Sequence, residues 1–182
     1  MAQLITDLHT IARLAEERRD EFEVIRYQFE FDDDLSDEEI DRFVDEISTP
    51  IISAVDCTAC ANCCRSLTIQ IGTDDIEWLA TGLRVSTEQF CQQHIEEQSD
   101  EDAPHVTGTF RQKPCHFLGG NLCTVYEYRP EACRAYPQFT PDFRWMFEWM
   151  LDGARVCPII YNVLDQISTK FDDFQYGNAK KV

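Results

Sequence analysis

The sequence predicts an α+β fold that is mostly helical, with a small β-hairpin or sheet around a cysteine-ligated metal site. Apolar residues recur at helical spacing near both ends of the 182-residue chain. Near the middle, two short segments flank a glycine-containing turn, which is typical of a hairpin. Nine cysteines, four of them within eight residues, indicate metal or redox chemistry.

The acidic charge is concentrated at the start of the chain. Residues 1–50 hold 16 acidic and 5 basic residues, which gives −11 of the formal net charge of −18. We therefore expect an acidic helical segment over 1–50 and a cysteine-cluster metal-binding domain over 51–182. Such a surface repels phosphate, so nucleic acid is not an expected partner. Another protein is a possible partner for the acidic N-terminal helices.

Two helices are predicted in this acidic segment. The first covers residues 3–30 and ends before a run of three aspartates. Ser36 and Glu39 have the spacing of a capping box, which starts a second helix. Pro50 predicts the end of that helix or a bend in it. The apolar positions of the first helix are Leu4, Leu8, Ile11 and Leu14.

The segment after the first cysteines is predicted to contain a short strand, two helices and a loop. Residues 67–71 alternate like a short strand, and the pair at 74–75 starts a short helix. Ser86 and Gln89 form a second predicted capping box, for a helix that reaches about residue 97. The acidic residues 98–105 are expected to form a loop.

A hairpin and further helices are predicted in the remainder. Residues 115–118 and 122–126 flank a Gly-Gly-Asn turn. Pro130 suits the start of a helix that carries Cys133, whereas the aromatic-rich residues 141–151 are ambiguous. The apolar positions of the last predicted helix are Ile160, Val163, Leu164, Ile167 and Phe171.

The cellular compartment follows from what the sequence lacks. No apolar run approaches the length of a membrane span, so no membrane association is expected. The N-terminus has neither a basic start nor an apolar core like a secretory signal, so we expect a cytoplasmic protein. In that reducing compartment, dense cysteines indicate metal ligands rather than structural disulfides.

The cysteine pattern predicts a set of metal ligands. The C-x2-C-x2-C spacing of the first run and a later cysteine–proline pair are used by iron–sulfur proteins of the bacterial ferredoxin type. Cys64 directly follows Cys63, and neighbouring side chains diverge, so Cys64 faces a second site or supports the first. Its available partners are Cys115, Cys123 and Cys133, and a turn at Gly119-Gly120 would bring the first two together across a hairpin. Cys91 sits alone in a helical pattern and is taken as a buried bystander. The predicted ligands are Cys57, Cys60, Cys63, Cys64, Cys115, Cys123, Cys133 and Cys157.

The kind of metal is less constrained than the ligands. Zinc and iron–sulfur clusters both accept four thiolates. Zinc ribbons usually have two separated C-x2-C knuckles, and the second is absent here, which favours an iron–sulfur cluster, with 4Fe–4S as the expected type. One or two centres are possible. Arginines near the cysteines in sequence would compensate an anionic centre: Arg65, Arg129, Arg134 and Arg155.

The combined motifs resemble the YkgJ-type cysteine-cluster family, described as a zinc- or iron-chelating domain. The resemblance covers about residues 55–160 and rests on the first cysteine run, the segments after Cys115 and Cys123, and the Arg-Pro-x-x-Cys-Arg-x-Tyr-Pro segment around Cys133. Many members have glycine where this chain has Ala61 and Ile159. The resemblance implies metal binding. A related pattern in flagellin lysine methylases, thought to combine an iron–sulfur centre with S-adenosylmethionine, is a reason to consider an enzyme.

Three functions remain open from the sequence. The first is a metal- or cluster-binding protein that acts as a carrier, sensor or redox partner. The second is an iron–sulfur-dependent enzyme, such as a methyl-transferring or redox enzyme, although no catalytic motif is present. The third is a structural zinc module for protein interaction.

His116 is a possible outer donor or fourth ligand beside Cys115.

Overall fold

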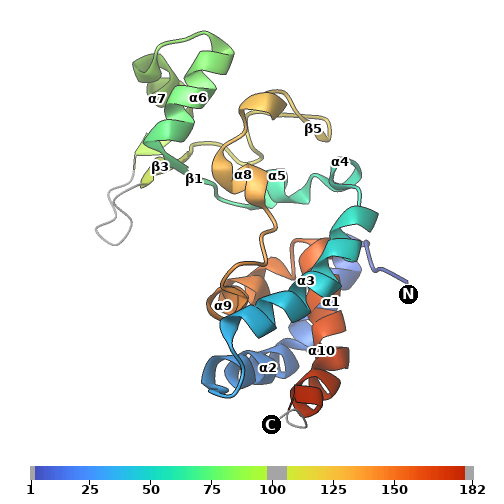
Figure 1. The fold of residues 1–182 in the computed structure, drawn as a ribbon. Helices are drawn as coiled ribbons and strands as arrows, with labels where there is room; N and C mark the ends of the chain where they lie inside the picture. Colours follow the sequence, from blue (N-terminus) through green and yellow to red (C-terminus); the bar gives the residue numbers. More distant parts are fainter. Residues whose placement is uncertain (1–2, 98–105, 179–182) are drawn as a thin grey trace. The chain divides into compact units, whose positions relative to one another are not determined.

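The computed structural model describes residues 3–97 and 106–178, which divide into two units (Figure 1). The helical unit draws on residues 1–56 and 137–182, so it contains both ends of the chain. The cysteine-rich unit consists of residues 57–136. Helices dominate and the strands are short and antiparallel, which confirms the predicted α+β class.

The helical unit is built from five long helices in the described residues. Helices α2 and α9 pack against each other, and α3 packs against α10 (Figure 1). The helix predicted over 3–30 is two helices, because the chain breaks its helical dihedral angles at Arg18. The helices are α1 (Leu8–Glu17), α2 (Arg19–Phe31), α3 (Asp37–Ala54), α9 (Phe143–Gly153) and α10 (Pro158–Asn178).

Aromatic packing around Phe29 holds these helices together. The Phe29 ring on α2 meets Phe171 on α10 edge to face, with ring centroids 5.0 Å apart. It also meets Phe143 on α9 edge to face at 6.0 Å. Such edge-to-face pairs add to the free energy of burying the rings. The ambiguous segment 141–151 is thus drawn into α9 by its buried aromatic face.

The start of α3 was predicted correctly, and of the two alternatives for Pro50 the structure rules out the end of the helix. Ser36 and Glu39 form the expected capping box. The helix does not end at Pro50 but runs through it to Ala54. Ile47 and Ile51 are both buried on the same face, so the apolar stripe continues across the proline. Burial of that stripe outweighs the one backbone hydrogen bond that proline cannot donate.

The cysteine-rich unit contains short elements around a small sheet. Strands β1 (Gln70–Gly72), β3 (Val106–Phe110) and β2 (Ile95–Glu97) form an antiparallel sheet in that order. Ile71 lies opposite Gly108, and Ile95 lies opposite Phe110. The remaining elements are α4 (Cys57–Cys60), α5 (Asn62–Ser66), α6 (Thr73–Leu83), α7 (Thr87–His94), β4 (Leu118–Gly119), β5 (Leu122–Cys123), the 3₁₀ helix η1 (Tyr126–Tyr128) and α8 (Glu131–Ala135).

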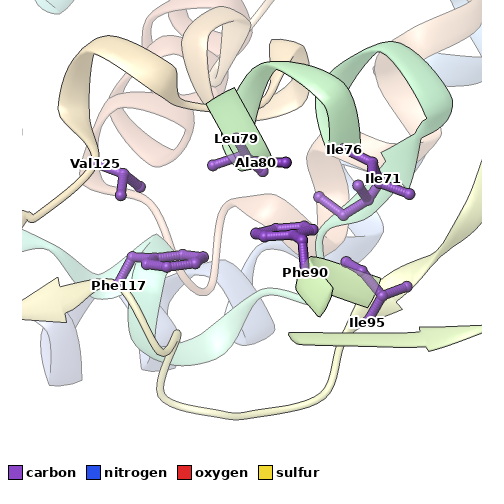
Figure 2. Close-up of a cluster of buried hydrophobic side chains, with 8 residues drawn as sticks. All are labelled: Ile71, Ile76, Leu79, Ala80, Phe90, Ile95, Phe117 and Val125. Atoms are coloured by element: carbon purple, nitrogen blue, oxygen red, sulfur yellow. The ribbon is translucent and has the colours of Figure 1, made fainter. Parts of the chain in front are cut away.

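An apolar cluster lies between this sheet and helices α6 and α7 (Figure 2). The rings of Phe90 and Phe117 stack nearly parallel, with centroids 6.4 Å apart. The helix predicted to reach residue 97 ends at His94, because Ile95 turns into β2 and is fully buried. The capping box of Ser86 and Gln89 is confirmed.

Two sequence expectations concern the rest of the chain. The acidic stretch predicted as a loop, residues 98–105, lies outside the described residues. In the described segments, no helix is both long and apolar enough to cross a membrane.

Candidate metal centre

The first cysteine run forms two short helices joined by one residue. Cys57 is the first residue of α4 and Cys60 is its last. Cys63 and Cys64 lie in α5. Ala61 between them has φ 49° and ψ 23°, a left-handed conformation that reverses the chain direction. The Sγ atoms of Cys63 and Cys64 are 4.0 Å apart. Adjacent cysteines therefore keep their thiols close together, although one side chain follows the other in sequence.

The tip of the hairpin clamps this run. The Arg65 guanidinium donates to the carbonyl oxygen of Cys60 at 2.6 Å and also to the side-chain oxygen of Asn121. The Asn121 amide in turn donates to the Ala59 carbonyl oxygen at 3.0 Å. The turn residue Gly120 has φ 64°, which suits glycine. Sequence reasoning placed Asn121 in a turn but missed this clamp, because the partner is 62 residues away.

The hairpin positions Cys115 and Cys123 beside Cys64. The backbone N–H of Cys115 donates to the Cys64 carbonyl oxygen at 2.8 Å. The predicted turn is present, and Cys123 pairs with Leu118 across it. Cys115 itself precedes β4, because its carbonyl oxygen accepts from the Leu118 N–H in a turn at 3.0 Å. The hairpin thus brings the two cysteines to one region, although its two paired strands are shorter than the predicted segments 115–118 and 122–126.

Cys133 is positioned by α8, the helix predicted to start at Pro130. The Glu131 N–H donates to the Asp75 carboxylate on α6 at 2.9 Å, which ties the first turn of α8 to another helix. The Trp78 ring on α6 lies 5.1 Å from the Tyr128 ring just before α8. These contacts fix the short helix on which Cys133 is carried.

Electrostatic coupling shows which thiols lie near one another. Burial first, and then negative charge on Cys64, Cys115 and Cys123, raise the pKa of Cys133 to about 12. Burial and the charge of Cys64 also raise the pKa of Cys115 and of Cys123. We call these four residues the thiol quartet: Cys64, Cys115, Cys123 and Cys133.

Cys64 is the member of the quartet that ionises most readily. A hydrogen bond from Cys63 lowers the pKa of Cys64 to about 6 against the effect of burial, with help from the positive charges of Arg65 and Arg129. The Arg129 guanidinium lies over the Tyr126 ring, 3.7 Å from its centroid. The charge of Arg129 also opposes the rise in the pKa of Cys123 and Cys133, so it acts on three of the four thiols.

The donor set fits a soft metal, although the thiols are spread apart. All nine cysteines are thiols rather than disulfides. Within residues 3–97 and 106–178, no three cysteine, histidine or carboxylate side chains lie close enough to ligate one ion. Four soft donors in one region suit tetrahedral zinc or an iron–sulfur cluster. Binding then requires the quartet side chains to turn toward a common centre.

Two further cysteines and one histidine have other contacts. Cys157 belongs to the helical unit, where it is 7% exposed at the start of α10. Cys91 packs against the apolar cluster of Figure 2 and has Glu97 and Glu88 as its electrostatic neighbours. His116 hydrogen-bonds Gln112 at 3.1 Å and faces His94, with ring centroids 4.7 Å apart.

A small α+β unit with eight cysteines, seven of them on α4, α5 and α8 or around the hairpin, is a cysteine-cluster domain by class. The chain belongs to the CxxCxxCC family, described as "Putative zinc- or iron-chelating domain", whose model matches residues 56–157. This match confirms the resemblance seen in the sequence. No curated protein and no solved structure is significantly similar to the chain.

Proposed function

We propose that the cysteine-rich unit is an iron–sulfur protein module in which the thiol quartet holds the cluster. The observation that carries the proposal is the hydrogen bond from the Cys115 N–H to the Cys64 carbonyl oxygen at 2.8 Å, which joins the first cysteine run to the segment that leads into the hairpin. The charges of Cys64, Cys115 and Cys123 also act on Cys133, so the thiolate forms need a cation to stabilise them. A metal centre supplies that charge.

The other cysteines of the first run form the second ligand group in this proposal. Cys57, Cys60 and Cys63 lie on α4 and α5, next to Cys64. They supply either additional ligands to the same centre or most of a second one. Cys157 stays a predicted ligand, which its own serine variant tests separately.

The proposed chemical role follows from the charge of the centre. Four thiolates around a doubly charged core leave an anionic centre, which Arg129 and Arg65 compensate from nearby. A bound cluster would supply one-electron exchange, and its potential depends on such nearby charges. We therefore favour a carrier, sensor or redox partner over an enzyme. Structural zinc in the same quartet is the second candidate, because four thiolates also suit a closed zinc site.

Metal analysis of anaerobically purified protein tests the proposal. We expect iron and acid-labile sulfide, with a brown colour and visible absorbance. Cys133→Ser should lose most of the metal, because it removes the thiol on which the charges of the other three all act, whereas the matched control Cys91→Ser should keep it. A colourless protein with stoichiometric zinc supports the zinc module instead. Unchanged metal in Cys133→Ser would contradict the quartet assignment.

A further inference from the structure

Two tryptophans form an exposed ridge on the helical unit. Trp145 is 62% exposed and Trp149 is 79% exposed. They are four residues apart on α9, so they lie on one face of that helix, a turn apart. A contiguous exposed patch of large apolar side chains marks a candidate interaction surface.

The ridge does not belong to the core. Phe143, Phe147 and Met150 fill the buried face of α9, so the tryptophans point to the other side. The helix is also held firmly. Arg144, next to Trp145, donates to the Asp37 carboxylate at 2.6 Å and to three backbone carbonyls at the end of α2 and after it. A rigid platform of this kind presents the two indole rings without a cost in ordering the backbone.

An acidic hollow borders the start of α9. Its volume is about 670 Å³. Asp41, in its wall, accepts hydrogen bonds from the backbone N–H groups of Asp142 and Phe143 at 2.9 and 3.0 Å. Asp41 therefore joins the wall of the hollow to the first turn of α9, in which Trp145 lies. The lining residues are Glu38, Asp41, Arg42, Asp45, Glu46, Thr49 and Pro50, four acids and one base.

Further negative charges lie on α9 itself and on α2. Asp152 follows Trp149 on the same face of α9 and pairs with Arg19 at 3.0 Å. On α2, Arg26 pairs with both Glu23 and Glu30. These bases are therefore engaged within the unit. Over its whole length, the helical unit has 23 acidic and 10 basic residues, a formal net charge of −13.

We propose that this face binds a cationic amphipathic helix of a partner protein. Leucine-like side chains of that helix pack on Trp145 and Trp149, and its lysine or arginine side chains enter the acidic hollow. A second copy of the chain is disfavoured because two such faces carry like charge. An anionic lipid surface is disfavoured for the same reason. The cationic helix satisfies both the apolar ridge and the charge beside it.

Tryptophan fluorescence and calorimetry on the full-length, metal-loaded protein test this proposal. The probe is a synthetic helical peptide of leucine and lysine, and the matched peptide has glutamate in place of lysine. We expect the lysine peptide to bind and shift the tryptophan emission, and the glutamate peptide not to bind. Trp145→Ala with Trp149→Ala should weaken binding at least about tenfold. The control Val24→Ala, which shortens a 57% exposed apolar side chain on α2, should leave it unchanged.

Charge is tested by Glu38→Gln with Glu46→Gln, which leaves the Asp41 cap of α9 intact. We expect binding several-fold weaker and less sensitive to added salt. Equal binding of the two peptides, or full binding by the tryptophan variants, overturns the proposal. Two further results also overturn it: a dimer that the tryptophan substitutions dissociate, and an emission shift with phosphatidylglycerol vesicles but not with the lysine peptide.

Discussion

Ala61 shows how a single residue shapes the first cysteine run. Its left-handed backbone separates α4 from α5, and its side chain is 5% exposed. A left-handed conformation costs a non-glycine residue roughly 1–2 kcal/mol. The methyl group regains part of that cost through burial, and alanine restricts the unfolded chain more than glycine does. The position therefore tolerates alanine or glycine and little else.

Substitution of Ala61 separates these effects. We expect Ala61→Gly to change the free energy of unfolding by less than about 1 kcal/mol, because the relief of strain and the lost burial oppose each other. Ala61→Val should cost more than about 2 kcal/mol and lower the metal content, because a branched residue fits neither the backbone nor the packed space. Urea unfolding and metal analysis measure both outcomes. A valine variant as stable as the glycine variant would contradict this account.

The sequence identified cysteine residues better than their arrangement. It named Cys115, Cys123 and Cys133 as the partners available to Cys64, and these are the thiols coupled to it. It also expected a turn at Gly119-Gly120 to bring Cys115 and Cys123 together across a hairpin, and in the structure the strand partner of Cys123 is Leu118. Spacing along the chain specifies which residues can meet. It does not specify where a two-residue ladder starts, because that depends on contacts such as the distant Asn121 clamp.

At the scale of elements, a charged cluster joins the start of α2 to α10. The Arg18 guanidinium donates to Glu21 at 2.8 Å and to Ser168 on α10 at 2.8 Å, and it pairs with Asp165. The Ser168 hydroxyl also donates to Glu21. The Arg18 hydrogen bond chiefly, with help from Ser168, lowers the pKa of Glu21 to about 2.

This shift predicts how acid weakens the packing of α2 on α10. A carboxylate whose pKa is lower in the folded state stabilises the fold above its ordinary pKa, which is 4.5 here. That stability is lost as the pH falls from there toward about 2. We expect Glu21→Gln to be less stable than the wild-type chain near neutral pH, with the difference shrinking in this window. Urea unfolding at a series of pH values measures it.

The control for Glu21 is the exposed pair of Arg13 and Glu17. Its side chains are 59% and 53% exposed, so Glu17→Gln should have little effect on stability at any pH. A stability difference for Glu21→Gln that stays constant down to the lowest pH would contradict the role of its carboxylate.

For the two helices with capping boxes, the starts were predicted better than the ends. Ser36 and Ser86 begin their helices with capping boxes, because a cap depends on residues three apart. The ends depend on distant partners. Residues 95–97 leave the helical pattern because they pair with β3, and α3 passes Pro50 because Ile51 is buried. No local signal carries that information.

At the scale of the whole molecule, the chain forms the helical unit from its two ends and the cysteine-rich unit from its middle. The helical unit has a large core of its own, with aromatic rings from α2, α9 and α10. The cysteine-rich unit has short strands and helices around the smaller cluster of Figure 2. Small units with limited cores depend more on metal ligation for their stability. The two units should therefore respond differently to loss of the metal.

Hydrogen exchange on the full-length protein, with and without a chelator, tests this difference. We expect metal removal to speed exchange in residues 57–136 by at least about tenfold, because ligation contributes to the folding of that unit. The amides of α2, α9 and α10 should keep their rates, because aromatic packing protects them. The variant Cys91→Ser should behave like the wild-type chain. Equal acceleration in both units would mean that they unfold together, and unchanged exchange throughout would mean that the thiols hold no structural metal.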